Sequence, residues 1–211
     1  VDFHCKKYFR KYQEQKSGED LFRARRFFTL AAGFYALADV ITVVSPEEKR
    51  DIEKNLSHVK NVEIVPNIHH LKIPEKTFEQ RKNLCYVGNF GVNQNIDAVR
   101  YFIGKIFPYI LEKDPLMEFH VVGSRSEELK DEFESENVKV IGYVKDMKKT
   151  LENYKVFVCP MTYGAGLKGK IGSAVEAGLP FVSTSIGVEG YPAKDGEECF
   201  IADDPATFAQ K

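Results

Sequence analysis

From Leu84 onward, short apolar runs alternate regularly with segments of helical periodicity. The predicted strands are Leu84–Val87, Glu118–Val122, Val138–Ile141, Val156–Cys159, Pro180–Ser183 and a weaker run at Cys199–Ile201. Helices are predicted between them at residues 96–110, 126–135, 145–153 and 168–178, with Pro108 kinking the first or starting a second helix. Apolar strands joined by helical crossovers indicate an α/β fold, with a parallel sheet covered by helices on both faces. In such sheets, ligands bind at the carboxyl ends of the strands, near a topological switch point.

The residues before Leu84 show a different organisation. Val1–Leu37 predicts two helices broken near residues 17–20, and a strand, a helix and a second strand are expected at 38–44, 46–56 and 62–65. Ser45 and Glu48 have the spacing of a capping box, with Pro46 at the first helical position. Residues 68–82 lack periodicity and indicate a linker. We therefore predict one domain at 1–67, an interdomain linker at 68–82 and a second domain at 83–211.

Composition excludes several classes of protein. The 211 residues carry a net charge of −1, whereas dedicated nucleic-acid binders normally carry a clustered cationic excess. No apolar run reaches the roughly 18–20 residues that span a bilayer, and no signal-peptide pattern opens the chain. The four cysteines are far apart, and Cys85 and Cys159 lie in apolar runs, which indicates buried free thiols of a cytosolic protein. The five histidines lack metal-ligand spacing; His120 is expected in the core, and His69 and His70 in solvent.

A glycine-rich stretch follows the predicted strand Val156–Cys159. Five of the fifteen glycines fall within residues 164–178, where the chain also opens a helix. Glycines allow close backbone approach to a ligand, and a helix N-terminus offers N–H groups to an anion. Lys168 and Lys170 add mobile positive charge where the helix dipole disfavours cations. The pattern predicts an anion site; the alternative is a flexible loop with solvated lysines.

Two further loops follow predicted strands. Gly88 and Asn89 lie where a phosphate loop would be, without a complete dinucleotide fingerprint; the alternative is a tight turn with Asn93 or Asn95 as helix cap. Tyr143 follows another strand, where its ring could stack on a nucleobase and neighbouring amides could bind the base edge. The alternative for Tyr143 is packing against the next helix.

These motifs in order resemble a GT-B glycosyltransferase, in the retaining family 4 group. The resemblance covers about residues 38–208 and rests on Val40–Ser45, Val65–Asn67, Val87-Gly88, Val121–Gly123, Ile141–Val144, Gly164–Lys170, Gly178–Pro180, Thr184 and Gly187. It implies that the second domain is Rossmann-like and binds a nucleotide-sugar donor. Residues 1–45 would be the last piece of an acceptor-binding domain, so we expect the chain to be a fragment.

The resemblance also assigns roles to individual positions. It places the donor diphosphate at Lys168, Lys170, Gly88 and Asn89, and the sugar along the backbone of Gly164, Ala165, Gly166 and Leu167. Tyr143 and Val144 would face the base, and Ser173 the ribose. Ala165 and Ser173 stand where the family has the glutamates of its E-x7-E motif, and Asn89 and Asn93 stand near its usual Arg and Lys.

The expected activity is retaining transfer of a sugar, from a donor such as a UDP- or GDP-sugar to a hydroxyl of a glycan or lipid-linked acceptor, in polysaccharide biosynthesis. Neither a metal nor a cofactor is expected, and the fragment alone should be inactive. The expected location is the cytoplasm, at the inner face of the membrane if the basic, aromatic helix at 3–12 contacts anionic lipid; a buried interdomain helix is the alternative. Two other functions stay open, a binding module with degraded catalysis and a nucleotide-sugar epimerase.

Overall fold

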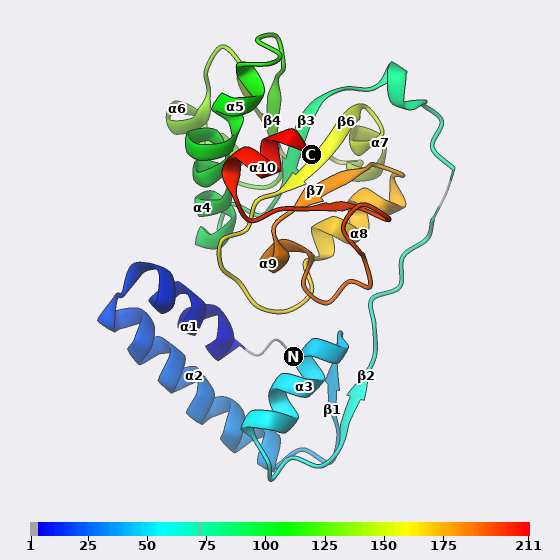
Figure 1. Ribbon diagram of the computed structural model, residues 1–211. Coiled ribbons are helices and arrows are strands. Elements are labelled where there is room, and N and C mark those ends of the chain that lie inside the picture. The colour runs from blue at the N-terminus through cyan, green and yellow to red at the C-terminus, as the bar shows by residue number, and fades with distance from the viewer. Residues whose placement is uncertain (1–3, 72) are drawn as a thin grey trace. The chain divides into compact units, whose positions relative to one another are not determined.

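The computed structural model describes residues 4–71 and 73–211, which divide into two compact units (Figure 1). Unit 1 contains the described residues up to 68 together with two loop segments, 163–167 and 189–192. Unit 2 contains the remaining described residues from 69 to the end of the chain. The predicted domain boundaries near residues 68 and 82 stay predictions.

Unit 1 is built on three helices and a short parallel β-pair. Its elements are α1 (His4–Gln15), α2 (Gly18–Ala36), β1 (Ile41–Val43), α3 (Pro46–Asn55) and β2 (Val62–Ile64). Ile41 of β1 pairs with Val62 of β2, and both side chains are buried with Ile52 of α3. The helix break predicted near residues 17–20 is confirmed, while the predicted start at residues 1–3 lies outside the described chain.

Helix α3 begins at a side-chain cap. The Ser45 hydroxyl accepts a hydrogen bond from the Glu48 N–H at 3.2 Å, as the spacing predicts. The reciprocal bond of a capping box is displaced, because the Glu48 carboxylate accepts from the N–H of Val44 at 3.3 Å. One otherwise unpaired amide of the first helical turn is thus satisfied by Ser45.

We expect Ser45→Ala to lower the free energy of unfolding by about 1 kcal/mol, because an amide loses its acceptor. Ser17→Ala is the matched control, since Ser17 caps α2 without a side-chain hydrogen bond and should cost much less. Urea unfolding followed by circular dichroism measures both. Equal losses in the two variants would contradict the capping role of Ser45.

Unit 2 contains a six-stranded parallel sheet in the order β5-β4-β3-β6-β7-β8. Its strands are β3 (Lys82–Val87), β4 (Phe119–Val122), β5 (Val138–Gly142), β6 (Tyr154–Cys159), β7 (Phe181–Ser183) and β8 (Phe200–Ile201). This confirms the predicted α/β fold and all six predicted strands. The chain builds outward from β3 to β5 and then returns to place β6 on the other side of β3. The switch point therefore lies between the carboxyl ends of β3 and β6.

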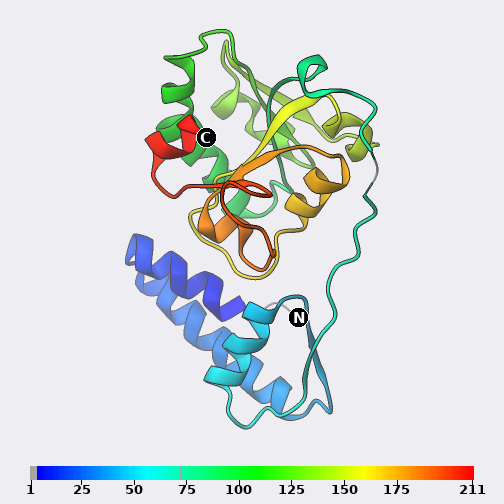
Figure 2. The same ribbon diagram turned by 45° about the vertical axis from the view of Figure 1, so that its right-hand side comes forward.

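Helices cover both faces of this sheet (Figures 1 and 2). One side carries α4 (Asn93–Tyr101), a π-helical turn (Phe102–Ile106), α5 (Phe107–Leu111) and α10 (Pro205–Gln210), and the other carries α7 (Met147–Leu151) and α8 (Gly169–Glu176). The remaining pieces are a 3₁₀ turn (Phe78–Gln80), a 3₁₀ turn (Ser126–Leu129), α6 (Lys130–Phe133) and α9 (Ser185–Val188). The rings of Phe102 and Phe119, with centroids 4.4 Å apart, join the first helix layer to the sheet.

The segment predicted as a long helix at 96–110 contains two α-helices with a π-helical turn between them. Pro108 lies in the first turn of α5, which confirms the predicted second helix start. The helix-cap prediction for Asn93 and Asn95 is wrong. Val92 occupies the cap position, and the Asn95 side chain instead bonds the carbonyl of Asn89 at 2.8 Å.

The segment predicted as a linker is fixed to α8 near both of its ends. The buried Arg81 guanidinium donates to the Gly178 carbonyl at 2.8 Å, beyond the C-terminal end of α8. His69 is half-buried against Gly172, and its Nδ1 lies 3.2 Å from the Glu176 carboxylate. The expectation that His69 is solvated is therefore wrong. Gly172 has no side chain, so the imidazole packs directly against α8.

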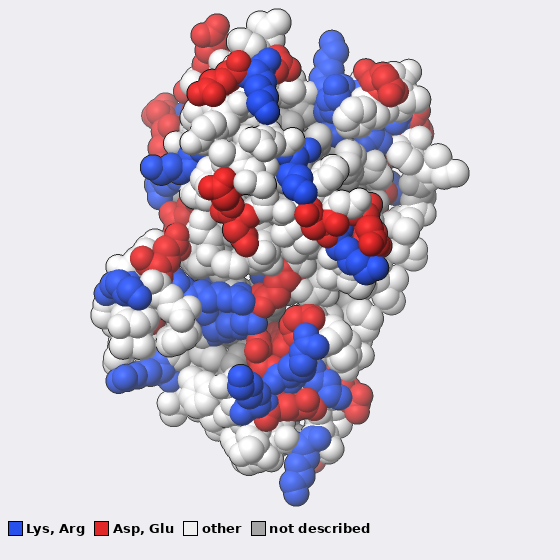
Figure 3. Space-filling view, in the orientation of Figure 1, with Lys and Arg blue, Asp and Glu red and all other residues white. Residues whose placement is uncertain are grey.

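The charged side chains give no dominant sign on the face shown in Figure 3, where basic and acidic groups are interspersed. All four cysteines are buried and free, as the sequence predicts for Cys85 and Cys159. Among the helices of residues 4–71 and 73–211, none is long and apolar enough to cross a membrane.

Candidate functional site

The loops after β3 and β6 meet at the switch point through a polar cluster. The Lys170 ammonium donates to the Tyr86 hydroxyl and to Asn95 Oδ1, the latter at 2.5 Å. It also lies 4.2 Å from the centroid of the Tyr86 ring. Tyr86 comes from β3, Asn95 from α4 and Lys170 from α8, so three elements far apart in sequence converge here. The convergence lies at the end of the sheet where the sequence predicts ligand-facing residues, and that prediction stays a prediction.

The Lys170 ammonium is enclosed by neutral partners. Burial is the main cause that lowers the pKa of Lys170 to about 8; Cys159 opposes this shift, and the neighbouring Lys168 ammonium adds to it. A buried cation is costly unless an opposite charge compensates it. Both described hydrogen-bond acceptors of Lys170 are uncharged. The cluster is therefore suited to stabilise an anion brought to it.

Lys168 is also buried, with 6% of its surface exposed. It occupies the N-cap position of α8, two residues before Lys170. The expectation that these two lysines are mobile is wrong, and so is the alternative of a flexible loop with solvated lysines. Lys168 is buried, and Lys170 is half-buried with its ammonium held by Tyr86 and Asn95. These partners are distant in sequence, so periodicity within one segment does not reveal them.

Gly88 and Asn89 form the turn after β3. The Gly88 N–H bonds Val122 of β4 at 3.0 Å, and the Asn89 carbonyl accepts from Asn95. A side chain at Gly88 would lie 3.1 Å from the Asn95 side chain, so Gly88 is closely packed. The turn is connected to Lys170 through Asn95, which places Gly88, Asn89 and Lys170 in one cluster.

The residues assigned to the base and the ribose lie apart from that cluster of contacts. Tyr143 is 70% exposed, and its N–H donates to the Glu127 carboxylate at 2.8 Å. Val144 is half-buried, and Ser173 donates to the Gly169 carbonyl within α8 at 3.3 Å. The roles predicted for Tyr143, Val144 and Ser173 therefore rest on the resemblance in sequence and not on contacts with Lys170. The amide of Tyr143 already has an acceptor in this structure.

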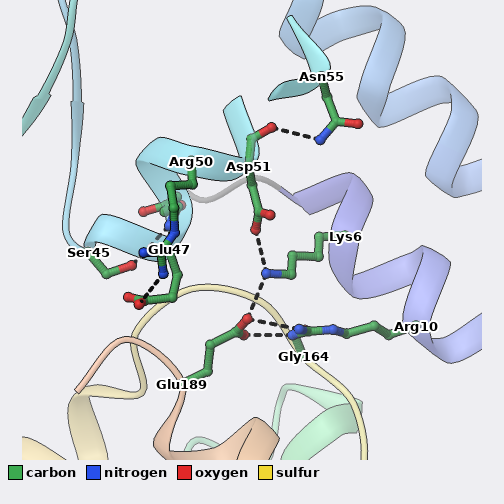
Figure 4. A network of polar contacts seen from close by, with 10 residues as sticks. Lys6, Arg10, Ser45, Glu47, Arg50, Asp51, Asn55, Gly164 and Glu189 are labelled. Carbon is green, nitrogen blue, oxygen red and sulfur yellow. Dashed lines mark hydrogen bonds and ion pairs between the residues drawn. The ribbon is translucent and has the colours of Figure 1, made fainter. Parts of the chain in front are cut away.

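The glycine-rich loop from Gly164 to Leu167 belongs to unit 1, where it meets α1 (Figure 4). Arg10 of α1 donates to the Gly164 carbonyl at 2.8 Å and to both oxygens of Glu189, at 2.6 and 2.8 Å. Lys6 donates to Glu189 at 2.6 Å and also pairs with Asp51 of α3. Burial opposes ionisation of Glu189, but the hydrogen bonds from Arg10 and Lys6 prevail and hold its pKa at about 2.

The site residues predicted from the sequence do not include Tyr86, Asn95 or Glu189. Tyr86 has the pattern of a core residue in an apolar strand, and Asn95 has the pattern of a helix cap. Glu189 lies in a short loop after α9 with no motif of its own. Their polar atoms are brought together by tertiary contacts. The one sequence signal for this site was Tyr86, a tyrosine near the carboxyl end of a strand, because a buried tyrosine hydroxyl usually finds a hydrogen-bond partner.

The parallel sheet with helices on both faces defines a doubly wound, Rossmann-like α/β domain. Residues 81–211 match the family described as "Glycosyl transferases group 1". The chain belongs to this family, and its second unit has the Rossmann-like architecture of GT-B glycosyltransferases.

Two curated proteins are similar in sequence. An "Uncharacterized 44.6 kDa protein in cps region" of Klebsiella pneumoniae is 28% identical over 155 residues, covering 69% of this chain and 40% of that protein. An uncharacterized glycosyltransferase of Methanocaldococcus jannaschii is 27% identical over 169 residues, covering 72% of this chain and 41% of that protein. The chain thus spans about 40% of the length of these relatives.

Solved structures share the fold at low identity. TarM of S. aureus, solved with Fondaparinux, alpha-GlcNAc-glycerol and UDP, has a TM-score of 0.68 at 18% identity, covering 90% of this chain and 38% of TarM. Anabaena Alr3699/HepE, solved with UDP and glucose, has a TM-score of 0.64 at 10% identity, covering 88% of this chain and 56% of HepE.

Proposed function

We propose that this chain provides the donor-binding part of a glycosyltransferase, which transfers a sugar from a nucleoside-diphosphate sugar to a hydroxyl acceptor. The observation that carries the proposal is the buried Lys170 ammonium, hydrogen-bonded only to neutral described groups at the switch point of the sheet. Membership in the group 1 family and the presence of UDP in two structures of the same fold support a nucleotide donor.

In the proposed reaction, Lys168 and Lys170 stabilise the negative charge that develops on the departing diphosphate. Fixed cations in a water-poor site stabilise such charge without the reorganisation that water would need. The Gly88-Asn89 turn supplies backbone beside this position, since Asn95 joins it to Lys170. We propose a retaining, metal-independent transfer, with Tyr143 and Val144 toward the base, Ser173 toward the ribose and the backbone of residues 164–167 toward the sugar.

A nucleotide panel tests the proposal directly. Thermal shift and calorimetric titration of the purified protein with UDP, GDP, ADP and CMP should show selective binding of one nucleoside diphosphate. A ligand at about 100 times its Kd should stabilise the folded state by roughly 2.7 kcal/mol. CMP, which has no β-phosphate, is the internal control. Absence of binding by every diphosphate would contradict the proposed donor site.

The lowered pKa of Lys170 predicts a pH dependence of binding. We expect nucleotide affinity to fall about tenfold between pH 7 and pH 9, because the ammonium loses its proton as the pH rises through about 8. The phosphate groups stay ionised in this range, since their second pKa is near 6. Calorimetric titrations at half-unit pH intervals measure the effect. Lys170→Met should remove it, and an unchanged pH profile in that variant would assign the titration to another group.

A binding module with degraded catalysis is the second candidate. It is favoured by the Ser173 hydroxyl, which bonds within its own helix, and by the lack of a carboxylate at Ala165. The two functions differ in turnover. The binding module is favoured if the protein binds nucleotide but releases no free diphosphate from any tested UDP- or GDP-sugar in the presence of an acceptor. An epimerase is indicated if the donor sugar is epimerised when no acceptor is present.

A further inference from the structure

A second polar site lies within unit 1, where the glycine-rich loop meets the loop that carries Glu189. A small cavity there is lined by Lys6, Ser45, Asp51, Ala165, Gly166 and Glu189, together with two glutamates of α3. Its volume is about 10 Å³, which is roughly the space that a single water molecule or hydroxyl group needs. A sugar ring or a phosphate group is too large for it.

Carboxylates outnumber cations around this cavity. Lys6 and Arg10 contribute two cations, which are hydrogen-bonded to Asp51 and Glu189 (Figure 4). Glu47 and Glu48 of α3 add two further carboxylates to the lining, and Glu47 pairs with Arg50. Such a cluster does not attract an anion. It does combine strong donors with strong acceptors, and a hydroxyl group is both donor and acceptor. The chemistry therefore fits a neutral, hydroxyl-bearing ligand.

The cluster is also rigidly placed. Gly190 has φ +89°, and a side chain there would lie 3.0 Å from the Ser45 side chain, so the loop after Glu189 requires glycine to approach α3. On the other side, Arg10 joins Glu189 to the carbonyl of Gly164. Glu189 is therefore held at a fixed position relative to the backbone of residues 164–166.

A purely structural role explains this arrangement less well. The side chains of Lys6, Arg10, Asp51 and Glu189 are 15–31% exposed, and ion pairs that are only partly buried contribute little to the stability of a fold. Fixed charges beside a cavity for a single hydroxyl are, in contrast, the arrangement that orients a polar ligand without reorganisation.

We propose that Glu189, positioned by Lys6 and Arg10, binds one hydroxyl group of the sugar to be transferred, in the cavity beside Ala165 and Gly166. This inference rests on the proposed function, in which residues 164–167 face the sugar. It deepens that function by assigning a specificity-determining residue. Glu189 would distinguish sugars by whether they present a hydroxyl at this position.

The test compares each nucleotide with its sugar derivatives in the purified protein. UDP is titrated beside UDP-glucose and UDP-galactose, and GDP beside GDP-glucose and GDP-mannose. We expect Glu189→Gln to lower the affinity for the bound nucleotide sugar about tenfold, since a hydrogen bond to a charged acceptor is lost. The affinity for the corresponding free diphosphate should change less than about twofold, because Glu189 is not assigned to the phosphates.

Two further variants keep the test decisive. Ala165→Val fills the cavity without removing a charge and should reproduce the selective loss, even if Glu189→Gln disturbs folding. Glu197→Gln makes the same chemical change in an exposed pair with Lys194 and should have no effect. Equal losses for diphosphate and sugar derivative, or no loss in either cavity variant, would overturn the inference. If the unmodified protein binds no diphosphate at all, the proposed function itself fails.

Discussion

Replacing Lys170 with methionine is expected to lower the affinity for the bound nucleoside diphosphate by about 10- to 100-fold, because charge-assisted hydrogen bonds contribute about 1.5–3 kcal/mol each. Methionine retains the unbranched shape of the side chain and removes the charge. The ammonium of Lys170 is already held by Tyr86 and Asn95 without a ligand, so little conformational entropy is lost when an anion binds. Lys168→Met should give a loss of similar size.

The control for both lysine variants is Lys194→Met, which removes an exposed ammonium paired with Glu197. Its affinity should match that of the unmodified protein. Calorimetric titration with the nucleotide selected in the panel measures all three variants, and circular dichroism verifies that they fold. Unchanged affinity in both Lys168→Met and Lys170→Met would exclude this cluster as the diphosphate site.

Replacing Gly123 with alanine is expected to cost about 3 kcal/mol or more in the free energy of unfolding, because it combines backbone strain with a clash. Gly123 follows β4 with φ +132°, a conformation that residues with a side chain rarely adopt. A Cβ atom there would lie 2.0 Å from the carbonyl oxygen of Gly88. Relief of the clash would displace the turn that carries Gly88 and Asn89, so nucleotide affinity should fall as well.

Gly104→Ala is the matched control in the same unit. No heavy atom lies within 4 Å of a side chain added at Gly104, which belongs to the helical layer over the sheet. Alanine there should raise stability by about 0.5–1 kcal/mol, since it restricts the unfolded chain. Urea unfolding of both variants gives the comparison. A Gly123→Ala protein as stable as the unmodified one would show that the close contact with Gly88 is not needed.

Gly123 and Lys170 belong to one set of packed residues at the carboxyl ends of β3, β4 and β6. Gly123 allows β4 to approach the turn after β3, Gly88 fits against Asn95, and Asn95 bonds the Lys170 ammonium. Close packing of glycines therefore determines where the cation lies. This is a reason to expect that stability and nucleotide binding change together at Gly123 and separately at Lys170.

The order of strands and helices in unit 2 was determined by the sequence alone. Apolar strands and helical periodicity are local patterns, and each strand from Leu84 to Ile201 was found from them. The glycine-rich turn before α8 was also recognised, because glycine clusters and lysines at a helix start are visible within fifteen residues. The Ser45 cap was predicted for the same reason, since its partner is three residues away.

The tertiary structure alone decided which polar atoms meet. Lys170 and Tyr86 are separated by 84 residues, and Arg10 and Glu189 by 179, so no local pattern relates them. Burial of Lys168, the contact of His69 with α8 and the role of Asn95 within the cluster depend on the same long-range packing. The sequence shows which side chains can carry a charge. The free energy of each charge, and its ability to bind a ligand, depend on the groups that surround it after folding.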